Sequence, residues 1–188
     1  RPSARALILD KHGALTWGTS AREAYEAMID LTRRAMEHQL SLCRPRAVKA
    51  DSGAPQDRRT LALELIPLFR GEAGKMKRVV LRWTDAPEVL RFLERPDAQQ
   101  LSPRGPYSPD HTLQIKARAL FYQPGGLISV ARAMEGYRNW YRGYYKRYAP
   151  PSAPLMDPNP RVILIPGVGL LTTGRDPGLA LIPQEIYL

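Results

Sequence analysis

Residues 6–23 decide the fold and read ALILDKHGALTWGTSARE. The apolar run at 7–9 is typical of a β-strand, and a second short strand is predicted over 14–17. Gly13 lies in the turn between them, where it can adopt the positive φ that tight turns require. A helix is predicted to follow, because the Ser-x-x-Glu motif that begins at Ser20 is a capping box.

The same pattern occurs again near the C-terminus. Residues 162–179 read VILIPGVGLLTTGRDPGL and align with 6–23 at a constant offset. The aligned identities are Gly13 with Gly169, Leu15 with Leu171, Thr16 with Thr172, Gly18 with Gly174 and Ala24 with Ala180. Matching glycines mark equivalent backbone needs, which favours a duplication over coincidence as the explanation. His12 corresponds to Val168, so the second turn is predicted to carry no ligand or base.

The segment between the two copies predicts further helices and strands. Helices are predicted over 20–42, 59–69, 85–93 and 127–148 and from 176 onward, and strands over 78–83, 111–122, 161–165 and 170–173. The helix over 20–42 is expected to bury one apolar stripe, and Pro67 is expected to kink or end the second helix. Residues 44–58 are predicted to form a polar linker, and residues 102–110 a loop. The fold class is therefore α/β, a layered sheet flanked by helices, with a degenerate repeat.

Composition excludes several classes of protein. The 188 residues are 44% hydrophobic and 24% charged, which excludes disorder throughout and fits one domain or two small ones. The single cysteine, Cys43, excludes an intrachain disulfide and a multi-cysteine zinc cluster. No apolar run approaches the roughly 20 residues that span a bilayer. We expect no membrane partner and a cytoplasmic, reducing location.

The net charge of +10 raises the question of nucleic-acid binding. The best candidate surface is the helix over 127–148, where aromatic side chains lie near Arg138, Arg142 and Lys146. Aromatic residues at helical spacing more often pack in a core, and these three cations more often form a solvated face. A basic nucleic-acid-binding module is therefore kept as the weaker alternative.

Three stretches carry a resemblance to a known family. Residues 11–18, KHGALTWG, resemble the class II aldolase/adducin family, in which a His-Gly pair at a strand turn supplies the third histidine ligand of a catalytic zinc. Residues 104–111, RGPYSPDH, together with Lys116, and the segments 166–170 and 174–176 are similar to one subfamily. That subfamily fuses a rhamnulose-1-phosphate aldolase-like region to a C-terminal short-chain dehydrogenase.

The resemblance implies a division of the chain and an activity. Residues 1–50 would end a class II aldolase-like lobe, and residues 51–188 would form a second, degenerate lobe. We interpret both ends as cuts, with the other zinc ligands and the catalytic acid before the chain and the dehydrogenase after it. The longer parent protein would cleave a phosphorylated ketose to dihydroxyacetone phosphate and an aldehyde. Its dehydrogenase part would oxidise the aldehyde or a related polyol with NAD. The parent protein is also expected to form a homo-oligomer. This piece alone is expected to be inactive. An adducin-like, non-catalytic scaffold is the alternative.

His12 is the one candidate metal ligand, and no catalytic residue is assigned. By the resemblance its imidazole would bind Zn²⁺, which polarises a substrate carbonyl; the alternative is an ordinary turn histidine. Asp110 and His111 form a second candidate polar site, for a metal or a phosphate, although an Asx turn explains them better. His38 is predicted to be solvated and Cys43 structural.

The glycines at 167–169 imitate a dinucleotide-binding fingerprint. A true G-x-G-x-x-G would need its third glycine at the position of Thr172. No cofactor-binding residue is therefore assigned, and NAD is expected only in the dehydrogenase part of the parent.

Overall fold

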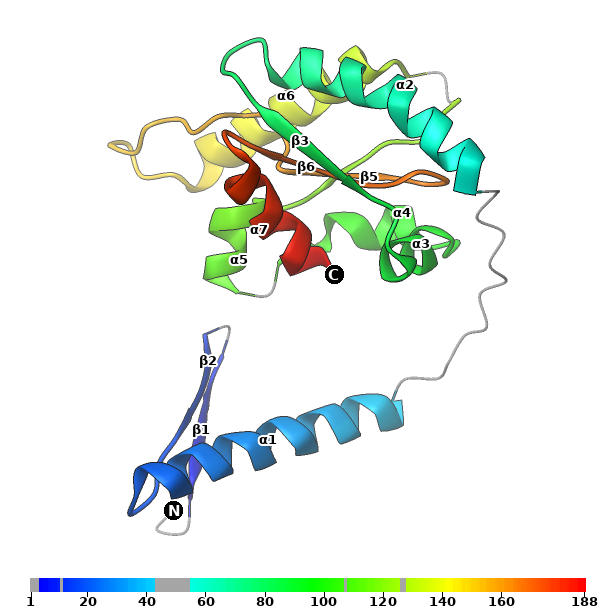
Figure 1. The fold of residues 1–188 in the computed structure, drawn as a ribbon. Coiled ribbons are helices and arrows are strands. Elements are labelled where there is room, and N and C mark those ends of the chain that lie inside the picture. Colours follow the sequence, from blue (N-terminus) through cyan, green and yellow to red (C-terminus); the bar gives the residue numbers. More distant parts are fainter. Residues whose placement is uncertain (1–3, 11, 43–54, 107, 126–127) are drawn as a thin grey trace. The chain divides into compact units, whose positions relative to one another are not determined.

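The computed structural model describes residues 4–10, 12–42, 55–106, 108–125 and 128–188. The chain divides into two compact units (Figure 1). The first contains strands β1 (Ala6–Leu9) and β2 (Gly13–Thr16) and helix α1 (Ala21–Leu42). The second contains α2 (Pro55–Ala73), β3 (Val80–Thr84), α3 (Pro87–Leu93), α4 (Ala98–Leu101), the 3₁₀ helix η1 (Ser102–Arg104), α5 (Pro109–Ile115), β4 (Leu120–Phe121), α6 (Val130–Tyr148), β5 (Val162–Ile165), β6 (Gly169–Gly174) and α7 (Pro177–Tyr187).

A four-stranded sheet forms the centre of the second unit. Its strand order is β3-β6-β5-β4, with β4 parallel to β5 and the other neighbours antiparallel. Figure 1 shows α2 and α6 on one face and α3, α5 and α7 on the other. Side chains of β5 alternate between the two faces, so Ile163 and Ile165 enter one core while Val162 and Leu164 enter the other. The predicted class, an α/β sheet flanked by helices, is confirmed.

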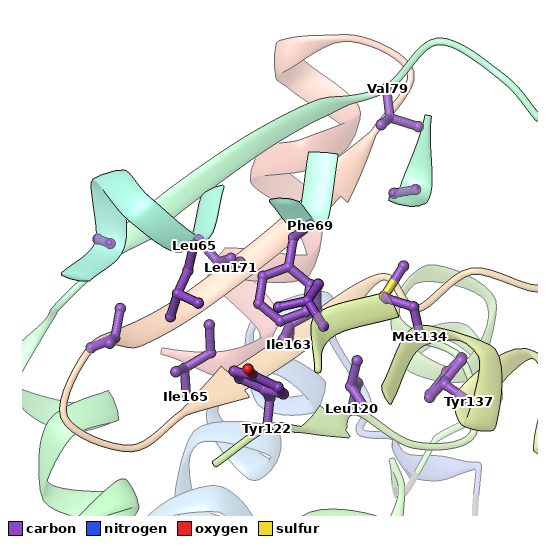
Figure 2. Close-up of a cluster of buried hydrophobic side chains, with 14 of the residues drawn as sticks. Leu65, Phe69, Val79, Leu120, Tyr122, Met134, Tyr137, Ile163, Ile165 and Leu171 are labelled. Carbon is purple, nitrogen blue, oxygen red and sulfur yellow. The ribbon is translucent and has the colours of Figure 1, made fainter. Parts of the chain in front are cut away.

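The larger core lies between the sheet and the layer of α2 and α6 (Figure 2). Phe69, Met134 and Ile163 are completely buried there. The rings of Phe69 and Tyr122 meet edge to face with centroids 5.2 Å apart, an arrangement that aromatic pairs favour. This core fixes the position of α6, the helix that also carries the buried Arg138.

Helix α2 differs from its prediction at both ends. It begins at Pro55, so residues 55–58 belong to a helix and not to a linker, and it continues past Pro67 to Ala73. A proline inside a helix removes one backbone hydrogen bond. Leu65 and Phe69 flank it and are buried, so their packing against the sheet outweighs that loss.

The strand predicted over 111–122 is wrong. Residues 109–115 form helix α5, and only Leu120 and Phe121 form a strand. Pro109 at the first helical position and Asp110 in the first turn both favour a helix start, which outweighs the apparent alternation further on. The loop predicted over 102–110 accordingly contains η1 and the first turn of α5.

Helix α1 has its predicted bounds, but its apolar stripe is not buried. The stripe residues Tyr25, Ile29, Met36 and Leu40 are all more than half exposed. The 22-residue helix is about 33 Å long, whereas the four-residue strands of the hairpin extend only about 13 Å. The hairpin therefore covers only the first part of the helix within this unit.

The N-terminus of α1 is capped in a modified way. Ser20 Oγ accepts a hydrogen bond from the Glu23 amide at 3.2 Å, as predicted. The Glu23 carboxylate does not bond the Ser20 amide; it accepts from the amide and hydroxyl of Thr19 at 2.8 and 2.7 Å. The capping box thus extends one residue further back than the motif indicates.

The two hairpins share one set of hydrogen bonds. The Thr16 hydroxyl donates to the Ala24 carbonyl at 2.8 Å, and the equivalent Thr172 hydroxyl donates to the Ala180 carbonyl at 2.6 Å. The His12 amide donates to the Leu9 carbonyl at 3.1 Å, and the equivalent Val168 amide donates to the Ile165 carbonyl at 3.0 Å. The glycines that close both turns have positive φ, 141° at Gly13 and 126° at Gly169. The repeat predicted from the sequence is therefore a repeat of structure.

What surrounds the two hairpins is different. In the second unit β6 pairs with β3, and β5 pairs with β4, so both outer edges are occupied. Among the described residues, β1 and β2 pair only with each other. Within the same described part of the chain, no helix combines the length and hydrophobicity needed to cross a membrane.

Candidate functional site

His12 lies at the tip of the first hairpin and is exposed. Its Nδ1 is 3.3 Å from the carbonyl oxygen of Asp10. Since a carbonyl oxygen only accepts hydrogen bonds, Nδ1 is the donor in this contact, and in the neutral tautomer that carries this proton Nε2 has the lone pair. Metal-binding histidines are commonly oriented in this way by a carbonyl behind the ring. The geometry therefore suits His12 for one metal bond through Nε2.

The rest of a metal site is not assembled by the residues that the structure describes. No group of three or more His, Cys, Asp or Glu side chains in those ranges could hold a metal ion. A catalytic zinc takes about three protein ligands. His12 could thus be one ligand of a site whose other ligands come from elsewhere.

The corresponding position in the second hairpin is closed. Val168 is completely buried, and its carbonyl accepts a hydrogen bond from Trp83 Nε1 at 3.1 Å. Trp83 belongs to β3, the strand that pairs with β6. The same turn is therefore an open tip in one unit and part of the core in the other.

The other candidate residues belong to two helices, with Asp110 and His111 in α5 and His38 in α1. Asp110 and His111 occupy the first turn of α5, where Asp110 is exposed and His111 half-buried. A carboxylate in a first turn is stabilised by the helix dipole, which accounts for Asp110 without a ligand. His38 is exposed on α1, as predicted. Cys43 lies outside the described residues.

The sequence identifies Lys116 only as part of the family resemblance, and its burial next to a small cavity was not predicted. Lys116 has a left-handed backbone with φ of 63°, and its ammonium donates to the carbonyls of Asp157 and Asn159. The Nζ atom also lies 4.2 Å from the ring centroid of Tyr141, a cation–π contact, and borders a cavity of about 180 Å³. Its two hydrogen-bond partners lie 41 and 43 positions further along the chain, so no local pattern could have indicated them.

The environment of Lys116 leads to a prediction on pH. Burial lowers the pKa of Lys116 from 10.5 to about 8 in the folded chain. Between these values the unfolded chain binds more protons, so the free energy of unfolding should rise by about 2 kcal/mol from pH 8 to pH 10. Above pH 10 the trend should reverse, because burial raises the pKa of Tyr187 to about 12 and the folded state then holds the extra proton.

Urea denaturation at a series of pH values measures this profile. In Lys116→Met the increase between pH 8 and pH 10 should disappear, while the decrease above pH 10 should remain. An increase of the same size in the variant would show that another group causes it.

The sequence predicts that Arg138, Arg142 and Lys146 form a solvated face, and for Arg138 this prediction is wrong. Arg138 is only 8% exposed. Its guanidinium lies 2.8 Å from Glu135, 3.2 Å from Glu72 on α2 and 3.3 Å from the side-chain oxygen of Asn159. The pKa of the Glu72 carboxyl is lowered by hydrogen bonds from Lys75 and then Arg138. Arg138 is buried because it is paired on three sides, a tertiary effect that helical spacing cannot show.

The aromatic face of α6 packs largely as expected for a core. Tyr137 and Tyr141 are buried, and Trp140 and Tyr144 pack against the same cluster with their ring planes 24° apart. Tyr148 at the end of the helix is exposed. This packing uses most of the aromatic surface that a stacking interaction with bases would need.

The fold and the exposed histidine at the hairpin tip define the class of protein. This is an α/β protein that repeats a strand–turn–strand–helix motif, with a histidine exposed at one of the two turns. The family described as "Aldolase class II, second domain" matches residues 60–188, more than half of the chain. The family described as "Class II Aldolase and Adducin N-terminal domain" matches residues 1–39. The chain belongs to the class II aldolase family.

A match to one curated relative extends over nearly the whole chain. The chain is similar to the protein named "Uncharacterized oxidoreductase YuxG" of Bacillus subtilis (strain 168), with 26% identity over 200 residues. The match covers 99% of this chain and 29% of the relative, so the chain spans less than a third of the relative's length. No solved structure matches the chain.

Proposed function

We propose that this chain is part of a zinc-dependent class II aldolase region in which His12 supplies one of the zinc ligands. The observation that carries the proposal is the orientation of His12, exposed at the hairpin tip with Nδ1 facing the Asp10 carbonyl. The family match over residues 1–39 supports it, because that match includes the hairpin. The reaction proposed is cleavage of a ketose 1-phosphate, such as rhamnulose 1-phosphate, to dihydroxyacetone phosphate and an aldehyde.

The hairpin is suited to presenting this side chain. Gly13, with φ of 141°, lets the chain turn back into β2 directly after His12, so the imidazole stays at the tip. A hydrogen bond from Nδ1 to the Asp10 carbonyl favours the tautomer in which Nε2 is the nitrogen offered to a metal. Zinc, when bound, would polarise the substrate carbonyl. The further ligands and the catalytic acid are proposed to come from outside this chain, which would leave the chain inactive alone.

The proposal extends to the organisation of a longer parent protein. Residues 1–50 would end the zinc-binding lobe, and residues 51–188 would be a degenerate copy; the shared hydrogen bonds of the two hairpins support this division. A fused short-chain dehydrogenase would oxidise the aldehyde or a related polyol with NAD. The relative's printed name, an oxidoreductase, and its much greater length support that part. We also propose a cytoplasmic homo-oligomer. An adducin-like scaffold is the alternative.

The test is a retro-aldol assay on the full-length parent protein. His12→Ala should lower the release of dihydroxyacetone phosphate by about 100-fold or more, because a metal site that loses one ligand holds and orients its metal poorly. Zinc content should fall in the same variant. His38→Ala is the matched control, since it removes an exposed imidazole from the same unit.

Two results would contradict the proposal. Full activity in His12→Ala would show that His12 is an ordinary turn histidine. A wild-type parent that binds no zinc and cleaves no ketose 1-phosphate would favour the scaffold.

A further inference from the structure

A cavity of about 900 Å³ lies beside β4 in the second unit. Its size is that of a typical small-molecule site. β4 is the edge strand of the sheet, and residues from it and from α6 line the cavity together with part of η1. The lining is mostly nonpolar, with Leu120, Phe121, Ile128 and Ala133 among its walls. Such a cavity can hold the nonpolar body of a ligand.

Arg118 is a charged residue of the cavity lining. Its guanidinium carbon lies 3.7 Å from the ring centroid of Trp140 and 5.9 Å from that of Tyr137. The Tyr137 hydroxyl donates to the Arg118 carbonyl at 2.8 Å, which holds the backbone of Arg118 in place. Stacking on an aromatic ring orients the planar guanidinium fork, the group best matched to a carboxylate or a phosphate.

This arginine has no acidic partner within the described part of the chain. Burial lowers the pKa of its guanidinium, and no carboxylate in those ranges forms an ion pair with it. Glu135 also lines the cavity, but its two oxygens contact Arg138 at 2.8 Å and Arg142 at 3.3 Å. Arg132 adds a second, exposed cation to the lining. The cavity therefore has an excess of positive charge.

We propose that this cavity binds a small organic anion, whose carboxylate or phosphate group pairs with Arg118 and whose nonpolar body packs between β4 and α6. A charged, partly desolvated arginine gains most from a bidentate oxyanion. The amide side chains of Gln99 and Gln123 in the lining can bond further polar groups of the ligand. The site lies wholly in the second unit, so it does not depend on the role proposed for His12.

Isothermal titration calorimetry of the 188-residue chain tests the proposal with four probes. Benzoate and phenyl phosphate combine a nonpolar ring with an oxyanion, benzamide has the ring without the charge, and inorganic phosphate has the charge without the ring. At least one of the first two should bind with a stoichiometry of one and about tenfold or more tightly than benzamide. Preference between benzoate and phenyl phosphate identifies the oxyanion as carboxylate or phosphate.

Two variants and matched controls tie the binding to this cavity. Arg118→Gln should weaken binding about tenfold or more. Gly136 lines the cavity, and a Cβ built on it meets nothing within 4 Å, so Gly136→Leu should narrow the cavity and weaken binding while keeping the charge of Arg118. Gly143 on the same helix is equally open but does not line the cavity, so Gly143→Leu should bind normally. Arg91→Gln on α3 is the charge control.

Three outcomes would overturn the proposal. They are no binding of either ring anion to the wild-type chain, equal binding of benzamide, and unchanged binding in Gly136→Leu. The last variant keeps the test decisive if Arg118→Gln fails to fold.

Discussion

Arg138→Ala is expected to lower the free energy of unfolding of the second unit by about 3 kcal/mol or more. Arg138 joins α6 to α2 through Glu72, whose side chain is only 12% exposed. It also bonds the side-chain oxygen of buried Asn159. Removing the guanidinium leaves a carboxylate and an amide oxygen with little access to water, and such orphaned groups cost more than the original bond contributes. Glu72 retains Lys75 at 2.6 Å, which places the loss at the lower end for a buried pair.

Urea denaturation followed by circular dichroism measures this loss. Arg142→Ala is the matched control, because Arg142 is four residues further along α6 and also contacts Glu135, but its side chain is 42% exposed. Exposed ion pairs contribute about 0–1 kcal/mol, so the control should change stability little. Arg138→Lys keeps the positive charge but lacks the planar guanidinium, so its loss of stability should fall between those of Arg138→Ala and Arg142→Ala. Equal losses in Arg138→Ala and Arg142→Ala would show that the buried network does not stabilise the fold.

Gly169→Ala is expected to destabilise the second unit by about 4 kcal/mol. Its φ of 126° is strained for any side chain, at about 1–3 kcal/mol. An added Cβ would also lie 2.3 Å from the carbonyl oxygen of Thr84 and 3.1 Å from the Cα of Asp85. Both contacts are with backbone, and Thr84 is paired with Leu170 in the sheet, so relief requires moving β3. Overpacking of this kind adds about 1–3 kcal/mol.

The repeat supplies the control for this substitution. Gly13 has φ of 141° in the equivalent turn, but a Cβ there meets nothing within 4 Å. Gly13→Ala should therefore cost only the backbone strain, about 1–3 kcal/mol, and only in the first unit. Thermal unfolding of both variants separates the two effects. A loss in Gly169→Ala no larger than that in Gly13→Ala would contradict the proposed clash with β3.

Local chemistry was sufficient to predict the elements whose boundaries are set by caps and turns. Both hairpins, α1 and α7 follow from glycine turns and from Ser20 and Asp176 as caps. Where packing decides, prediction failed: α2 passes through Pro67 because its neighbours are buried. The helix before β4 is an exception, because a proline and an acidic residue begin it and these local signals were outweighed in the prediction by an apparent alternation further on.

The candidate sites divide in the same way. The histidine at the hairpin tip is visible in the sequence as a His-Gly pair, although its role as a ligand came only from the resemblance. The surroundings of Lys116, Arg118 and Arg138 depend on partners far away in the chain, such as Glu72, which is 66 positions from Arg138. Hydrophobic periodicity cannot indicate such pairs, because it reports which face of an element is apolar and not what meets it.

The hairpin-and-helix motif has a consequence for how new activities can arise on this scaffold. Its shape is held by a threonine that bonds the following helix and by glycines at fixed places, none of which is the residue at the tip. The tip residue is therefore interchangeable without altering the frame. In the first hairpin, where no other strand of the described residues pairs with β1 or β2, the histidine at the tip is exposed, whereas in the second hairpin the valine at the tip is core beside β3. One position and one adjacent strand thus separate an exposed polar side chain from a buried apolar one.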